Sequence, residues 1–190
     1  MLYGLTNSCE TKKLRATVPV EEFLHTYVDV PRFLECCRVC PNYSARWSCP
    51  PYDFDPEALW RRFSVLEIRA MQVLPRTEEA KRAAAGDAAE FLRPFADAID
   101  GGLAVMEQNH PGALALHAGK CHLCRQCART EGKPCRMPEK MRYSIEALGG
   151  NVALVADKLL NVPLVWGKAG EAAEYYVMVG GLLLPADGHA

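Results

Sequence analysis

The segment from Gly119 to Gly149 restricts the fold of this chain more than any other, because it must bring several thiols to one place. Its four cysteines are Cys121, Cys124, Cys127 and Cys135. The first three recur at every third residue, and Pro138 follows soon after the fourth. Bacterial ferredoxins bind iron–sulfur clusters with three closely spaced cysteines and a cysteine that precedes a proline. The spacing therefore predicts a metal centre, specifically a [4Fe–4S] cluster.

A second group of cysteines lies in the segment 36–56. Cys37 and Cys40 have the C-x2-C spacing of a metal knuckle, and Cys49 follows on a proline-rich loop that would fold back towards the same ion. Cys36 is adjacent to Cys37, so its side chain points in another direction. The group predicts a second metal site with three thiolate ligands. The alternative is a proline- and aromatic-rich loop whose cysteines are buried incidentally.

Hydrophobic periodicity predicts an α+β fold, with a small, largely antiparallel sheet flanked by helices. Strands are predicted at 25–30, 64–74, 113–119 and 174–184, whereas residues 1–20 show no clear periodicity. Helices are predicted from Pro31, over 55–62, from Thr77 towards Asn109, near Ile145 and over 151–161.

Glycine and proline refine these predictions. Pro94 and Gly101-Gly102 predict a break or kink in the long helical segment, and Gly180-Gly181 indicates a bulge or a close backbone approach in the last strand. We expect a single metal-binding domain over 1–190, whose two cysteine-rich metal-binding loops, 36–56 and 119–149, lie near each other.

The nine cysteines occur in a chain with no recognisable signal peptide and no apolar run long enough to span a membrane. These features predict a cytoplasmic protein whose cysteines are metal ligands or redox groups rather than disulfides.

Net charge is −1, yet residues 120–142 hold seven basic residues against two acidic ones. This basic segment would offset the charge of a thiolate cluster or dock a redox protein partner; a solvated face is the other interpretation. Neither the overall isoelectric point of the chain nor a recognised motif favours nucleic-acid binding.

With both motifs identified, the chain resembles the predicted metal-binding proteins, a domain-of-unknown-function family of microbes. The resemblance covers the chain from about residue 25 onward. It rests on CRVCPNYSARWSCPPYDFDP (37–56), GKCHLCRQCARTEGKPCRMPEKMRYSIEALG (119–149) and EYYVMVGGLLL (174–184). It implies metal or iron–sulfur binding through Cys37, Cys40, Cys49, Cys121, Cys124, Cys127 and Cys135. It implies no established reaction, and Cys9 and Cys36 fall outside its pattern.

The seven cysteines divide into a group of four, which would fill every site of one [4Fe–4S] cluster, and a group of three. The three would bind a second cluster with one open iron, or a zinc ion completed by a nitrogen, oxygen or solvent ligand. The first hypothesis is thus an iron–sulfur electron-transfer protein or a redox accessory protein.

Two further hypotheses remain. One is a zinc-stabilised interaction module, although the cysteine triplet suits a tetrahedral ion poorly. The other is an enzyme that uses an open iron at the N-terminal cysteine loop, with Tyr43, Arg46, Trp47 and Tyr52 lining a pocket. No catalytic triad, phosphate loop or dinucleotide motif in the sequence names a reaction.

Overall fold

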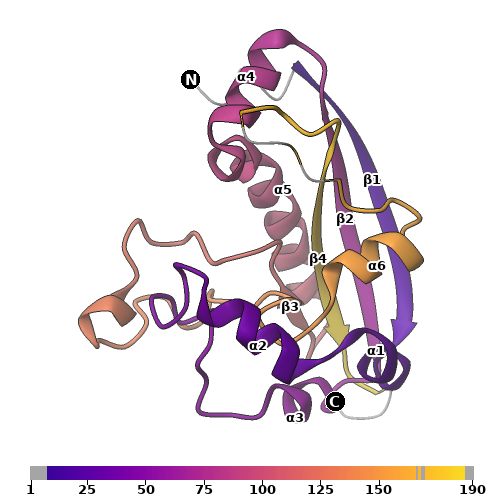
Figure 1. Ribbon diagram of the computed structural model, residues 1–190. Helices are drawn as coiled ribbons and strands as arrows, with labels where there is room; N and C mark the ends of the chain where they lie inside the picture. Colours follow the sequence, from indigo (N-terminus) through magenta and orange to yellow (C-terminus); the bar gives the residue numbers. More distant parts are fainter. Residues whose placement is uncertain (1–7, 166, 168–169, 187–190) are drawn as a thin grey trace.

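The computed structural model describes residues 8–165, 167 and 170–186, and its centre is a four-stranded antiparallel sheet in the order β1-β2-β4-β3 (Figure 1). The strands are β1 (Cys9–Pro19), β2 (Val65–Pro75), β3 (Leu114–Leu116) and β4 (Tyr176–Leu184). Every neighbouring pair is antiparallel, which confirms the predicted α+β class with an antiparallel sheet.

Helices cover both faces of the sheet. On one face, α4 (Glu78–Gly86) and α5 (Ala88–Asn109) contact β2, and α5 also contacts β3 and β4. On the other face lie α1 (Val20–Tyr27), α3 (Pro56–Trp60) and α6 (Val152–Lys158). In β2, Leu66, Ile68 and Ala70 belong to the core under α1 and α6, whereas Met71 and Val73 belong to the core under α5. This alternation follows the two-residue period of a strand and agrees with the sequence prediction.

Two segments leave this body on the same side. The helix α2 (Val30–Arg38) has no buried residue and leads into the N-terminal cysteine loop. The loop after β3 carries the other cysteines and the short 3-10 helix η3 (Ala128–Glu131). In Figure 1 both loops lie beside each other, away from the sheet.

Local capping explains why several predicted helices form where the sequence places them. The side chain of Asp29 accepts a hydrogen bond from the Arg32 backbone at the start of α2, which has proline in its first turn. The N-terminal residues of α3, α4 and α6 are capped in the same way by Asp55, Thr77 and Asn151.

The prediction of a strand at 25–30 is wrong. These residues form the end of α1 and the beginning of α2, and only Val28 makes an isolated bridge, to Gly150. The physical reason lies upstream, where Val20, Phe23 and Tyr27 recur at helical spacing and are buried in one core.

Other boundaries also differ from prediction. The first twenty residues contain β1, an edge strand whose side chains are mostly exposed, so its alternation of apolar and polar residues is weak. The long helical segment divides at Asp87, which caps α5, while Pro94 lies within that helix. The helix predicted near Ile145 is a series of turns over 145–149. Within the described residues, no helix has the length and apolar character needed to cross a bilayer.

The glycine pair in β4 is a site of close approach, one of the two possibilities predicted. A Cβ atom on Gly180 would lie 2.8 Å from Cδ1 of Leu103 and 2.9 Å from the carbonyl oxygen of Leu116. The pairing of β4 with β2 continues without interruption through both glycines, so no bulge is present. Glycine here allows α5 and β3 to pack directly against β4.

We expect Gly180→Ala to lower the free energy of unfolding by about 1–3 kcal/mol, because the added methyl group overpacks this contact. Gly101→Ala in α5 is the matched control, since a Cβ there meets nothing within 4 Å. That substitution should leave stability unchanged or raise it by about 0.5–1 kcal/mol, as alanine favours a helix over glycine. Urea unfolding measures both, and equal stability of the two variants would contradict the packing argument.

Candidate metal centre

The four cysteines of the C-terminal loop line one small cavity of about 20 Å³. Three apolar residues of the same segment, Leu123, Met137 and Met141, and three residues of the N-terminal loop complete its wall. Burial, and to a smaller extent the neighbouring thiols of Cys135 and Cys127, raises the pKa of the Cys121 thiol. The structure thus brings the whole predicted C-terminal set to a single place.

Both ends of this cysteine loop are fastened to α5. Ahead of the loop, the backbone N–H of Ala118 donates to Oδ1 of Asp100 at 2.8 Å. Behind it, Arg142 forms a two-pronged ion pair with Glu107, with both N···O distances 2.7 Å and both side chains largely buried. Because charge-assisted bidentate pairs fix geometry, α5 determines where the loop begins and ends.

His117 pairs with Asp100 instead of lining the thiol cavity, with Nδ1 lying 3.4 Å from the carboxylate. Burial, followed by the charge of Arg142, lowers the pKa of His117 to about 4. Burial also raises the pKa of Asp100 to about 6. The imidazole is therefore neutral at neutral pH.

The three cysteines of the N-terminal loop also lie within electrostatic reach of one another. Burial, followed by the charges of the other thiols in the group and of Glu146, raises the pKa of the Cys37 thiol to about 11. Since a metal binds the thiolate, a cation at this site would have to offset that cost of ionisation. Cys36 is exposed on α2, whereas its neighbour Cys37 is half-buried and lines a cavity.

Backbone and side-chain donors shape this loop around its cysteines. The backbone N–H of Cys40 donates to the carbonyl of Cys37 at 2.9 Å, which closes a tight turn at the end of α2. The backbone N–H and Nδ2 of Asn42 both donate to Sγ of Cys40 at 3.5 Å. These two contacts fix the position of the Cys40 sulfur within the turn.

The two cysteine loops touch through residues 46–48, which confirms their predicted proximity. Ser48 is buried, and its hydroxyl accepts a hydrogen bond from the Cys121 backbone at 3.2 Å while lying 3.8 Å from Sγ of Cys49. Arg46 Nη1 donates to the Cys121 carbonyl at 3.0 Å. One serine therefore links a cysteine of each group.

Arg129 of η3 holds the N-terminal loop by its carbonyl groups. Its guanidinium donates to the carbonyl oxygens of Arg46 at 2.9 Å, Cys49 at 2.5 Å and Pro51 at 2.5 Å. It also lies over the Trp47 ring, 5.0 Å from the centroid, in a cation–π contact. A single arginine thus clamps the loop on which Cys49 lies.

Aromatic side chains form a second, larger cavity of about 530 Å³ beside the thiols. Trp47, Tyr52, Phe54 and Tyr143 line it together with Cys135. Of the four residues predicted to share a pocket, Trp47 and Tyr52 are found here, whereas Arg46 lines the thiol cavity. Tyr43, the fourth, lines neither cavity.

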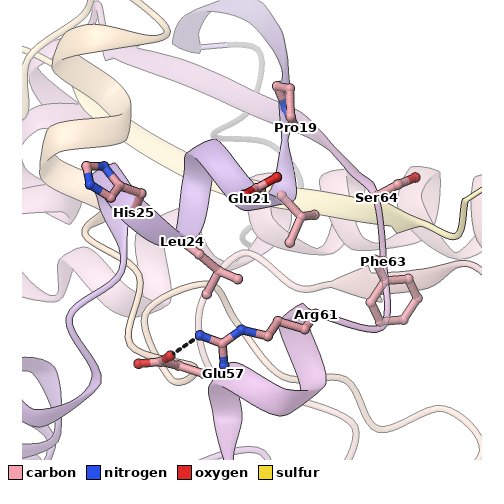
Figure 2. A pocket seen from close by; sticks show the side chains of 9 residues that line it. Pro19, Glu21, Leu24, His25, Glu57, Arg61, Phe63 and Ser64 are labelled. Carbon is pink, nitrogen blue, oxygen red and sulfur yellow. Dashed lines mark hydrogen bonds and ion pairs between the residues drawn. The ribbon is translucent and has the colours of Figure 1, made fainter.

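The most voluminous cavity described, about 660 Å³, lies elsewhere, between α1 and α3 (Figure 2). Its wall includes Leu24, His25 and Phe63, and an ion pair of 2.7 Å joins Glu57 to Arg61 along it. It contains no cysteine, so it is not the candidate metal centre.

In the part of the chain that the structure describes, no three histidine, cysteine, aspartate or glutamate side chains are already grouped to hold a metal ion. The thiol side chains would therefore have to turn together to coordinate one.

Sequence reasoning missed Ser48 and Arg129 as the contacts between the loops. The only sequence signal for Arg129 is its place in the basic segment, for which charge compensation, docking of a partner and a solvated face are the interpretations.

Comparison with known proteins finds one family. Residues 25–184 match the family described as "Predicted metal-binding protein (DUF2284)". No curated protein and no solved structure matches the chain. The match covers most of the chain and includes both cysteine loops, which supports metal binding without specifying the metal.

We expect Arg129→Ala to lower the free energy of unfolding by about 2 kcal/mol, because hydrogen bonds from a charged donor contribute about 1.5–3 kcal/mol each and this side chain is partly exposed. Arg129→Lys should lose most of that stability, since one ammonium cannot reproduce the planar fork. Arg125→Ala, at an exposed position of the same loop, is the control. Urea unfolding of the three variants is the measurement, and Arg129→Ala as stable as Arg125→Ala would refute the clamp.

Proposed function

The chain belongs to the DUF2284 family of predicted metal-binding proteins, and from this premise we propose that it is an iron–sulfur electron-transfer or redox accessory protein. In this proposal Cys121, Cys124, Cys127 and Cys135 bind a [4Fe–4S] cluster. One observation carries it: four thiols with a ferredoxin-like spacing line a single cavity.

The chemistry around the cavity supports thiolate ligation. Thiolates select iron–sulfur clusters or zinc among the common metals. Arg46 lines the cavity, and its charge offsets part of the negative charge that four thiolates would bring. The apolar side chains of Leu123, Met137 and Met141 line the cavity beside the sulfurs, and an apolar shell helps to set the reduction potential of a bound cluster.

Zinc is the second candidate, and the size of the cavity favours it. A space of about 20 Å³ holds roughly one water molecule, which is closer to the size of a single ion than to that of a cubane. A [4Fe–4S] cluster would require the thiols to turn outwards. Both metals require coordinated movement of the cysteine side chains, so metal analysis has to decide between them.

The proposal includes a second centre at Cys37, Cys40 and Cys49. Three thiolates leave one coordination position for another ligand or a substrate, which is the condition for an enzyme with an open iron. The link through Ser48 between Cys49 and Cys121 would give electrons a short route between the two centres. A redox partner would dock on the exposed basic residues of 120–142, among them Lys133, Arg136 and Lys140.

Protein purified without oxygen should be brown and should contain iron and acid-labile sulfide, because thiolate-ligated iron–sulfur clusters absorb broadly in visible light. Iron, zinc and sulfide analysis per chain is the measurement. Colourless protein with stoichiometric zinc and no sulfide would reject the iron–sulfur proposal and support the zinc module.

Single substitutions should separate the two centres. Cys124→Ser should remove the iron of one centre and leave the other if the sites are independent; loss of all iron would mean that both loops share one centre. Cys36 and Cys37 form a matched pair, because they are adjacent on α2 but only Cys37 faces a cavity. Cys37→Ala should lose metal and Cys36→Ala should keep it. Equal losses would contradict the assignment.

A further inference from the structure

One face of the sheet is left partly open along β1, the outer strand at the edge opposite β3 (Figure 1). On that face α5 packs on β2, β3 and β4, whereas β1 packs mainly on β2 and α1. A cavity of about 470 Å³ lies between α5 and the strands β1 and β2. Sites for small organic ligands measure about 300–1,000 Å³. No cysteine of the described chain lines this cavity, so it is separate from the candidate metal centre.

Three cationic side chains line the cavity, and no acidic residue of the described chain does. They are Lys13 and Arg15 on β1 and Arg69 on β2. Arg15 lies directly opposite Arg69 in the register of the two strands, and Lys13, two residues along, is on the same face of the sheet. Like charges at directly opposite positions destabilise a sheet. An anion in the cavity would remove this repulsion.

The protein itself supplies few partners for these cations. Nη2 of Arg69 donates to Glu67 at 2.6 Å, but Nε of Arg69 is shielded from solvent and has no acceptor among the described residues. Lys13 and Arg15 are exposed, and neither has an ion pair or a side-chain hydrogen bond within the part of the chain that the structure describes. Because Glu67 offsets only one of the three charges, the cavity keeps a net positive charge.

Protection of the sheet edge explains only part of this charge. Charged side chains on an exposed outer strand hinder edge-to-edge pairing with another chain, and Lys13 and Arg15 on β1 fit that role. Arg69 does not fit it, because β2 lies inside the sheet and pairs with β1 on one side and β4 on the other. An arginine on an inner strand, opposite a second arginine, therefore needs another explanation.

One wall of the cavity is apolar and comes from α5. Ile99, Leu103 and Met106 line it at spacings of four and three residues, which place them on one side of the helix. Gly180 of β4 is the register partner of Arg69, and a Cβ on this glycine would lie 2.8 Å from Leu103 and 3.2 Å from Ile99. The apolar wall therefore stands beside the position of Arg69.

We propose that this cavity binds a small amphipathic anion, which has an anionic headgroup on an apolar tail. The headgroup, a carboxylate or a phosphate, lies among the three cations, where a guanidinium donates bidentate, charge-assisted hydrogen bonds. The tail lies along the apolar wall of α5. A concave site of this size fits a small molecule better than the flat surface of a bilayer. The site goes beyond the proposed function and does not depend on which metal the cysteine loops bind.

Isothermal titration calorimetry with decanoate and with decyl phosphate tests the proposal, on protein purified without oxygen and each probe below its micelle concentration. Acetate, which lacks the tail, and 1-decanol, which lacks the charge, are the control ligands. We expect saturable binding of at least one amphiphile, and affinities for acetate and 1-decanol at least about tenfold lower. The amphiphile that binds more tightly identifies the headgroup.

Two neighbouring glycines of α5 provide matched variants. Gly102 lines the cavity and Gly101 does not, and a Cβ on either meets nothing within 4 Å. Gly102→Leu should weaken amphiphile binding at least about tenfold, because its side chain displaces part of the tail from the apolar wall. Gly101→Leu should bind like the wild type. Neither substitution removes a contact of the protein, so both variants should fold.

A second pair of variants tests the charge. Arg69→Gln should weaken amphiphile binding about tenfold, because it removes a charged donor to the headgroup. Lys12→Gln is the control, since Lys12 is exposed on β1 but does not line the cavity. It should leave the affinity unchanged.

Any of three results would overturn the inference. The first is the absence of saturable binding of both amphiphiles; if the protein then sediments with phosphatidylglycerol vesicles, this face meets a membrane surface instead. The second is equal binding of 1-decanol, which would show that the cations play no part. The third is unchanged affinity in Gly102→Leu, which would place the ligand elsewhere on the protein.

Discussion

The relation between the two cysteine loops depends on the guanidinium of Arg129. Neither loop has a regular strand or long helix to hold it, and a loop without such support needs its backbone carbonyls satisfied by other means. Arg129 meets that need for Arg46, Cys49 and Pro51 at once and stacks on Trp47. Ser48 then completes the contact from the other side, through the Cys121 backbone. Cys49 of one group and Cys121 of the other therefore lie beside the same serine, Ser48.

The α+β body supplies the fixed points for this interface. Through Asp100 and Glu107, α5 holds the two ends of the C-terminal loop, and α5 itself is packed on the sheet where Gly180 permits close approach. The turn that carries Glu146 is pinned to the start of α2. The cysteines of each group are therefore positioned by elements distant in sequence. Such a scaffold fixes the backbone of both cysteine loops.

Much of this arrangement could be predicted from the sequence, because the decisive patterns are local. The alternation in β2, the capping residues Asp55 and Thr77, and the cysteine spacings each reflect one element. The contacts that join elements could not be predicted in this way. Nothing in the neighbours of Arg129 marks it as a clamp.

The two strand predictions that failed, at the N-terminus and at 25–30, have a common physical origin. β1 is an edge strand with one buried residue, and the 25–30 segment combines a strand-like composition with a helical burial pattern that begins at Val20. In both cases tertiary packing decided between weak local preferences.

The central claim is that the four thiols of the C-terminal loop hold a [4Fe–4S] cluster. Mössbauer spectroscopy of protein produced with isotopically enriched iron and kept free of oxygen tests it most directly, because the method reports the state of every iron atom in the sample. Most iron should give the spectrum of thiolate-ligated [4Fe–4S] clusters, and Cys124→Ser should lose the contribution of one cluster per chain. A spectrum of mononuclear or adventitious iron alone, unchanged in Cys124→Ser, would contradict it.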